Sequence, residues 1–279
     1  MRSFKEMRSS GRSTFKVKFF VFATVALMGF TQHASAVTLD SVSHIHHVKV
    51  IENKVLVLTH EGLYELVGKN DMKLIGKDRI DVMGFTSLGK LLFASGHPAI
   101  GSKMPNPIGL VKSLDGGLTW KSVSLVGKVD FHFLEGAGTD LYGADSQTGK
   151  LMYSSDSGKT WKDLGENTFT DIAVSPKMSG MAIAIKDSEL LLTEQAFKST
   201  TKIKNTLKIT QIEWRKSGLY GLGGSSLYKS TNSGKTWTKL STFKGVPGIL
   251  SASDQMMLVT VGSDIYTSNN EGKSFKKIS

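Results

Sequence analysis

Four segments of the chain read alike: Ser113-Leu-Asp-Gly-Gly-Leu-Thr-Trp120, Ser154-Ser-Asp-Ser-Gly-Lys-Thr-Trp161, Ser230-Thr-Asn-Ser-Gly-Lys-Thr-Trp237 and Ser268-Asn-Asn-Glu-Gly-Lys-Ser-Phe275. Their third positions are 41, 76 and 38 residues apart. Because 76 is twice 38, one unit between them has lost its turn, and Glu189 to Phe197 lies where that unit is expected. A further eroded copy, Gly62-Leu-Tyr-Glu-Leu66, precedes the first segment. Six units of about 40 residues are typical of four-stranded propeller blades.

The repeated segment has the chemistry of a hairpin turn. Its Asp or Asn side chain is suited to accept hydrogen bonds from backbone N–H groups of the same turn, and its Gly suits a positive φ. We expect the final aromatic residue to pack between neighbouring sheets. We therefore assign a structural role, rather than calcium or sugar binding, to eight residues: Asp115, Asp156, Asn232, Asn270, Trp120, Trp161, Trp237 and Phe275.

Apolar runs recur at the same place in every unit. They are rich in β-branched and aromatic residues, which favours strands over helices. The runs are 55–58, 91–94, 141–144, 181–185, 219–222 and 257–261. The predicted fold is an all-β, six-bladed β-propeller with Asp-box turns and four-stranded antiparallel blades.

The first 36 residues have the pattern of a signal peptide. Six basic residues and one acid precede an apolar run, Phe19 to Phe30, that is too short to cross a bilayer comfortably. The run ends at Ala34-Ser35-Ala36, the small-x-small pattern that signal peptidases cleave. We therefore predict a signal peptide over 1–36, a propeller domain over 37–279, no transmembrane span after cleavage, and an exported protein that is periplasmic or extracellular.

Much of the positive charge belongs to this leader. The whole chain has a formal net charge of +11, and the part after residue 36 retains 29 basic and 23 acidic residues. Its lysines are scattered at turns, which indicates a solvated surface and not a nucleic-acid groove. The chain has no cysteine, so thiolate metal sites and a cysteine nucleophile are excluded.

The first strands of the units bring unusual residues into register. His44, Asp81 and Asp130 occupy the opening position of the first three units, and His46 and His132 stand two residues after it. Antiparallel pairing places the ends of the second strands beside these positions, which adds three more residues: His60, His97 and Asp145. We expect all eight at one mouth of the central channel, walled by the proline-rich loop Pro98 to Ile108. His47 is expected to face the other way.

Three interpretations of this cluster remain open. The five histidines His44, His46, His60, His97 and His132 would bind a polar ligand such as a glycan or a cell-envelope component. Alternatively, four of them would hold a divalent metal ion as a cofactor: His46, His60, His97 and His132. Otherwise, the side chains would only hydrogen-bond one another and water.

Further strings resemble a family of secreted bacterial Asp-box (BNR-repeat) propellers that is labelled loosely as glycosyl hydrolase or sortilin-like. The strings are His44-Ile-His46, Thr59-His-Glu-Gly-Leu63, Met83-Gly-Phe85, Ser95-Gly-His-Pro98, Asp130-Phe-His132 and Tyr142-Gly-Ala-Asp145. The resemblance implies the propeller fold and a shared site. Sialidases of similar fold clamp their substrate with three arginines, whereas only Arg79 and Arg215 follow the leader, and lysine does not replace the bidentate guanidinium. Sialidase activity is therefore excluded.

These observations predict ligand binding, with two alternatives. The first is another glycoside hydrolase, which needs two carboxyl groups about 5–5.5 Å or 6.5–9.5 Å apart, and three carboxylates are candidates for catalysis: Asp81, Asp130 and Asp145. The second is a metal-binding protein or a non-catalytic assembly scaffold, like the Asp-box propellers that help assemble photosystem complexes. We expect a monomer that binds no nucleic acid.

Overall fold

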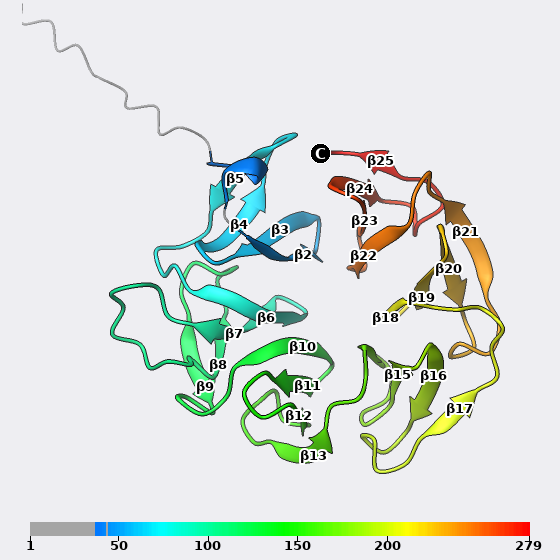
Figure 1. Cartoon of the computed structure of the whole chain (residues 1–279), viewed down its shortest axis with the longest axis horizontal. Coiled ribbons are helices and arrows are strands. Elements are labelled where there is room, and N and C mark those ends of the chain that lie inside the picture. Colours follow the sequence, from blue (N-terminus) through cyan, green and yellow to red (C-terminus); the bar gives the residue numbers. More distant parts are fainter. Residues whose placement is uncertain (1–36, 43) are drawn as a thin grey trace, which may run out of the picture. The chain divides into compact units, whose positions relative to one another are not determined.

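Six antiparallel sheets are arranged as blades around a central axis in the computed structural model (Figure 1), which describes residues 37–42 and 44–279. Each blade is built from strands that follow one another in the chain, and its first strand lies nearest the axis. The prediction of a six-bladed, four-stranded propeller is therefore confirmed. The predicted signal peptide lies outside the described residues.

Blade 1 carries one extra short strand on its outer edge. Its strands are β1 (Val37–Thr38), β2 (Ile45–Ile51), β3 (Lys54–Thr59), β4 (Gly62–Leu66) and β5 (Asp71–Leu74). Those of blade 2 are β6 (Asp81–Leu88), β7 (Leu91–His97), β8 (Leu110–Ser113) and β9 (Lys121–Ser124). Those of blade 3 are β10 (Phe131–Ala137), β11 (Asp140–Asp145), β12 (Lys150–Ser154) and β13 (Lys162–Glu166).

The remaining blades repeat this order. Blade 4 contains β14 (Asp171–Val174), β15 (Ala182–Lys186), β16 (Glu189–Thr193) and β17 (Thr201–Ile203). Blade 5 contains β18 (Gln211–Arg215), β19 (Gly218–Gly223), β20 (Ser226–Ser230) and β21 (Thr238–Thr242). Blade 6 contains β22 (Pro247–Ala252), β23 (Met257–Val261), β24 (Asp264–Ser268) and β25 (Lys276–Lys277).

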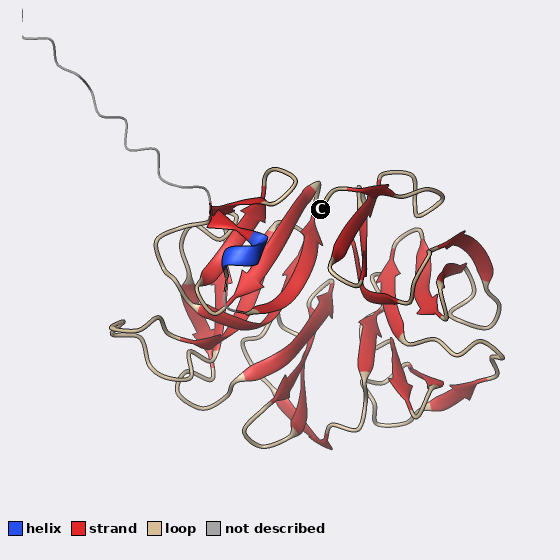
Figure 2. Ribbon diagram, turned by 45° about the horizontal axis from the view of Figure 1, so that its top comes forward, coloured by secondary structure: helices blue, strands red, loops and turns tan. Residues whose placement is uncertain are grey.

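Helix is almost absent from the described part of the chain. One 3-10 turn, η1 (Leu39–Ser41), lies beside blade 1 (Figure 2). No helix in residues 37–42 and 44–279 has the length and hydrophobicity that a membrane-spanning segment needs.

Separate hydrophobic cores hold neighbouring blades together. Leu58 of blade 1 packs with Phe85 of blade 2, for example, and both are almost fully buried. The ring is closed in the same way, because Val57 of blade 1 shares a core with Leu258 of blade 6. Burying one such side chain contributes about 1.5–3 kcal/mol. Apolar packing between sheets is therefore the main source of the ring's stability.

Hydrogen bonds from side chains within each repeated turn stabilise that turn. In blade 3, the Ser154 hydroxyl donates to Asp156 Oδ1 (2.8 Å) and accepts from the Gly158 N–H (2.9 Å). Asp156 in turn accepts from the N–H and the hydroxyl of Thr160, at 2.9 and 2.7 Å. The serine bond to the glycine N–H recurs in the turns that begin at Ser113, Ser230 and Ser268.

The aromatic residue of each turn packs where the repeat predicted. Trp161 contacts the core between blades 2 and 3, and its ring centroid lies 4.9 Å from that of Phe131. Its indole N–H donates to Ser124 of the preceding blade (3.0 Å). Trp120, Trp237 and Phe275 pack against the corresponding cores of other blades. The turn thus connects one blade to the next.

Blade 4, one of the two blades without the full repeated segment, keeps part of the turn. The Thr193 hydroxyl accepts hydrogen bonds from the N–H groups of Gln195 (3.2 Å) and Phe197 (2.9 Å). Ala196 and Phe197 have φ values of 50° and 59°, a region that L residues rarely adopt. A hydroxyl at the first position is therefore enough to hold the turn without the carboxylate.

Replacing the buried hydroxyl of one turn should destabilise the whole ring. Ser154→Ala leaves the buried Gly158 N–H without its acceptor, so we expect the free energy of unfolding to fall by about 1–3 kcal/mol. Urea unfolding followed by tryptophan fluorescence measures the change. Ser122→Ala, at an exposed position on β9, serves as the control and should change stability little. Equal midpoints for the two variants would contradict this role of the turn.

A candidate histidine–carboxylate site on blades 1 to 3

The first strands of blades 1 to 3 each contain a β-bulge at the same place. Pairing with the second strand shifts between Ile45 and His47, between Val82 and Gly84, and between Phe131 and Phe133. The extra residues are His46, Met83 and His132. The first strands of blades 4 and 5 pair without such a shift. A bulge changes the direction in which side chains project from a strand. The bulges therefore determine which side chains of blades 1 to 3 lie close together.

Three donor groups converge in the first cluster, which we call site 1: His46, His60 and Asp81. His46 Nε2 lies 3.0 Å from Asp81 Oδ1 and 3.2 Å from His60 Nδ1, and His60 Nδ1 lies 2.9 Å from Asp81 Oδ2. They come from the bulge of β2, the turn after β3 and the first residue of β6. The ring of His44 stands 4.9 Å from that of His46 and 5.3 Å from that of His60, measured between centroids.

Burial sets the protonation of the central imidazole. The side chain of His46 is only 7% exposed, whereas that of His60 is 47% exposed. Burial lowers the pKa of His46, although the nearby Asp81 opposes this change. The neutral imidazole, which is the form that binds metal ions, is therefore favoured at neutral pH.

A second cluster, site 2, contains His97, Asp130 and His132. Asp130 Oδ2 lies 2.8 Å from His132 Nε2 and 3.3 Å from His97 Nε2, and it accepts a hydrogen bond from the Ser146 hydroxyl (2.8 Å). Asp130 is 3% exposed, and its other oxygen, Oδ1, is buried without a hydrogen-bond partner among the described residues. In each cluster the candidate donor atoms lie within 4.8 Å of one another.

The proline-rich loop after β7 contacts site 2. Asn106 Oδ1 lies 2.8 Å from Nδ1 of His97, so the loop holds this edge of the imidazole ring. The other nitrogen, Nε2, lies 3.3 Å from Asp130 Oδ2. A hydrogen bond of this kind orients metal-binding histidines in proteins.

Asp145 supports site 2 from outside it. Its Oδ1 accepts the backbone N–H of Asp130 (2.9 Å), and its Oδ2 accepts the N–H and the hydroxyl of Thr148, at 3.2 and 2.6 Å. Oδ1 is therefore bonded to the residue before β10, and Oδ2 to the turn after β11. The structure places this carboxylate behind Asp130, where it fixes the backbone of that residue.

The two clusters adjoin on one face of the ring. In all three blades the start of the first strand pairs with the end of the second, as in Ile45 with Thr59, Asp81 with His97 and Phe131 with Asp145. The structure therefore brings the five predicted histidines together in two groups: His44, His46 and His60 with Asp81, and His97 and His132 with Asp130.

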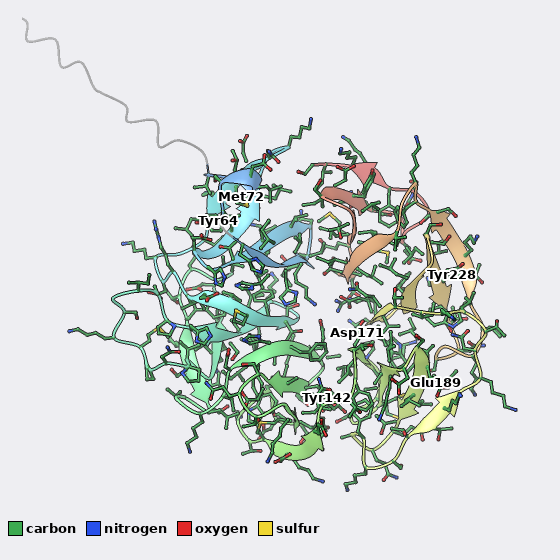
Figure 3. All side chains as sticks on the ribbon, viewed as in Figure 1. Tyr64, Met72, Tyr142, Asp171, Glu189 and Tyr228 are labelled. Carbon is green, nitrogen blue, oxygen red and sulfur yellow. The ribbon has the colours of Figure 1, made fainter. Side chains whose placement is uncertain are left out.

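A polar cavity of about 190 Å³ occupies the centre of the ring. It is lined by His47, Lys49, Glu135, Asp171 and Glu213, among others, and Asp171 is labelled near the axis in Figure 3. Lys49 forms an ion pair with Glu135. His132 also lines this cavity, so site 2 opens onto it.

The facing of His47 was predicted wrongly. Strict alternation along β2 places His47 opposite His46 and away from the axis, but the bulge adds one residue and His47 lines the cavity. Lys49 and Glu135 were likewise missed. Their charged side chains at alternate positions of otherwise apolar inner strands were the available signal.

The fold and these clusters define a six-bladed β-propeller with a histidine–carboxylate surface on one face. No family model and no curated protein matches the sequence. Among solved structures, a YCF48 protein bound to a D1 peptide is similar, with a TM-score of 0.51 and 16% identity over 87% of this chain and 82% of that one.

Two larger proteins contain a similar propeller. One is the GH74 enzyme of Niastella koreensis, with a TM-score of 0.57 and 15% identity over 84% of this chain. The other is PorZ, a surface component of the type-IX secretion system of Porphyromonas gingivalis, with a TM-score of 0.56 and 13% identity over 85% of this chain. This chain spans 37% and 33% of their respective lengths. At such identities the likeness establishes the fold alone.

The buried carboxylate in the cavity should make stability depend on pH. Burial raises the pKa of Asp171 to about 7, so between about pH 4 and pH 7 the folded protein binds more protons than the unfolded chain. The contribution of Asp171 to stability is complete below about pH 4 and is lost as the pH rises to about 7. Asp171→Asn should therefore flatten the fall in unfolding free energy over this range.

Urea unfolding at several pH values from 4 to 8 tests this expectation. The slope of unfolding free energy against pH is compared, because Asn accepts only one of the two backbone hydrogen bonds that Asp171 receives from Ile172 and Ile212. Asp78→Asn, at an exposed position, is the matched control. Identical slopes for the two variants would show that Asp171 is ionised in the folded protein throughout.

Proposed function

We propose that this chain is an exported Asp-box propeller that binds divalent transition-metal ions at sites 1 and 2, and through them a polar ligand of the cell envelope or its surroundings. The observation that carries the proposal is the convergence of two imidazoles and one carboxylate in each site, from segments far apart in the chain. Export rests on the signal-peptide pattern of residues 1–36, which leaves periplasm and medium as locations.

The donor spacing supports a metal ion. Donor atoms that bind one tetrahedral ion at about 2.0–2.1 Å stand roughly 3.3 Å from each other. In site 1 the two imidazole nitrogens stand 3.2 Å apart, and each lies 2.9–3.0 Å from a different oxygen of Asp81, so small side-chain movements would admit an ion. Imidazole with carboxylate suits zinc, iron, cobalt, nickel or copper, and three protein ligands leave a position open for a further ligand.

Two features favour an ion over a hydrogen-bonded network alone. In site 1, His46 Nε2 and His60 Nδ1 face each other and the same carboxylate, and no arrangement of protons satisfies all three contacts with linear hydrogen bonds. In site 2, Oδ1 of the buried Asp130 lacks a partner, which is costly unless a bound species completes the site.

Binding is a better proposal than glycoside hydrolysis. A hydrolase needs one carboxyl group to donate a proton and a second to act as base or nucleophile. Asp81 and Asp130 each contact two imidazoles, and both oxygens of Asp145 are engaged by backbone and hydroxyl groups. The candidate carboxylates are therefore arranged as ligands of cations and as turn caps.

Metal analysis tests the proposal directly. The protein, purified without a polyhistidine tag and dialysed against buffered zinc, should retain about two zinc ions per chain by plasma mass spectrometry. The double variant His60→Ala with His132→Ala should lose both ions, and it should still fold because both side chains are nearly half exposed. His47→Gln is the matched control, because His47 lies outside both sites and should leave the zinc content unchanged. Substoichiometric zinc in the unaltered protein would refute the function.

Asn106, the loop residue that orients His97, should affect the metal affinity of site 2 and not that of site 1. Asn106→Ala removes the acceptor for Nδ1 of His97, and loss of such an outer hydrogen bond typically weakens metal binding about 10–100-fold. Competition with a chelator, fitted to two sites, should show one weakened site and one unchanged site. A uniform loss at both sites would mean that the loop acts on the fold and not on His97.

A further inference from the structure

Sites 1 and 2 are linked by one pair of residues. Asp81 of site 1 and His97 of site 2 are direct partners in the register of β6 and β7. Directly opposite residues of an antiparallel pair project from the same face of the sheet, with Cβ atoms about 4.5–5.5 Å apart. The two sites therefore adjoin at this pair, with the Asp81 carboxylate directed to site 1 and the His97 imidazole directed to site 2.

Two glycines hold the strands at this separation. A Cβ atom on Gly96, which precedes His97 and has φ +142°, would lie 2.1 Å from the carbonyl oxygen of Asp81. A Cβ atom on Gly84 would lie 2.3 Å from the carbonyl oxygen of Phe131, between Asp130 and His132. Any side chain at either position would separate the strands that carry sites 1 and 2.

The net charge of sites 1 and 2, each with a divalent ion bound, indicates which ligand would bind to both ions. Each site supplies one carboxylate, so a divalent ion in each leaves a net charge of +1 per site and +2 for the pair. Each ion also keeps an open coordination position, because each site provides three protein ligands. Two adjacent positively charged ions with open positions favour an anion that carries two negative charges on separate oxygens.

We propose that the two ions act together and bind one phosphate group, with a different phosphate oxygen on each ion. This inference rests on the proposed metal binding. A phosphate or phosphate monoester carries about −1.5 to −2 charges near neutral pH, which matches the pair, whereas a simple carboxylate neutralises only half of its charge. A phosphate monoester on a larger molecule and free inorganic phosphate present the same chemistry to the site.

Calorimetry of the zinc-loaded protein tests the inference. Inorganic phosphate should bind at one equivalent per chain that contains two zinc ions, and the zinc-free protein should not bind it. His60→Ala should empty site 1, and His132→Ala should empty site 2. Each variant should retain one zinc ion and bind phosphate about 100-fold more weakly, because the second attachment raises affinity through effective concentration. His47→Gln is the control and should bind phosphate as the unaltered protein does.

A second titration with glycerol 3-phosphate distinguishes the sources of phosphate. Binding comparable to that of inorganic phosphate would identify a monoester on a larger molecule as a ligand, and binding of inorganic phosphate alone would identify the free ion. Two phosphates per chain, equal affinity in the single-site variants, or no binding of either compound to the two-zinc protein would overturn the inference. Absence of bound zinc would instead overturn the proposed function, so the two failures are separable.

Discussion

Antiparallel pairing between the first two strands of each blade determines where the polar residues meet. The start of the first strand lies beside the end of the second strand, at the same end of the blade. Asp81 therefore stands opposite His97 although 16 positions separate them in the chain. Packing between blades 1, 2 and 3 then places these ends of the three blades side by side. The cores between them pair Leu58 with Phe85 and Phe93 with Phe131. Without this register, the five histidines would be scattered over four segments of chain with no common surface.

The ring and the gathering of the histidines at one end of the blades were predictable, because both follow from the repeat. A period of about 40 residues implies equivalent strands, and equivalent strands imply that His46, His60, His97 and His132 gather at one end of the blades. The division into two clusters was not predictable. It depends on a bulge in each of three strands, which adds one residue and reverses the facing of everything after it, as His47 demonstrates. A bulge depends on local backbone pairing, and the pattern of side chains carries little trace of it.

The role of Asp145 illustrates a second limit of sequence reasoning. A carboxylate at the end of a strand, beside histidines, is a plausible site residue by position. Its side chain instead satisfies the backbone N–H of Asp130 and two groups of Thr148. Short polar side chains compete for nearby backbone groups, and only coordinates reveal which partner is closer.

The way the ring closes has a consequence for its dynamics. In residues 37–42 and 44–279 every blade consists of consecutive strands, so no strand of this part of the chain is exchanged between the first and last blades (Figure 1). Blades 6 and 1 meet through the core around Val57 and Leu258 and through a bond from the Val50 N–H to the Ser251 hydroxyl (3.0 Å). This junction is the one place where blades can separate without any linking segment of chain. Transient opening should therefore begin there, and amide protons of β2 and β22 would exchange with solvent sooner than those of β10 or β14.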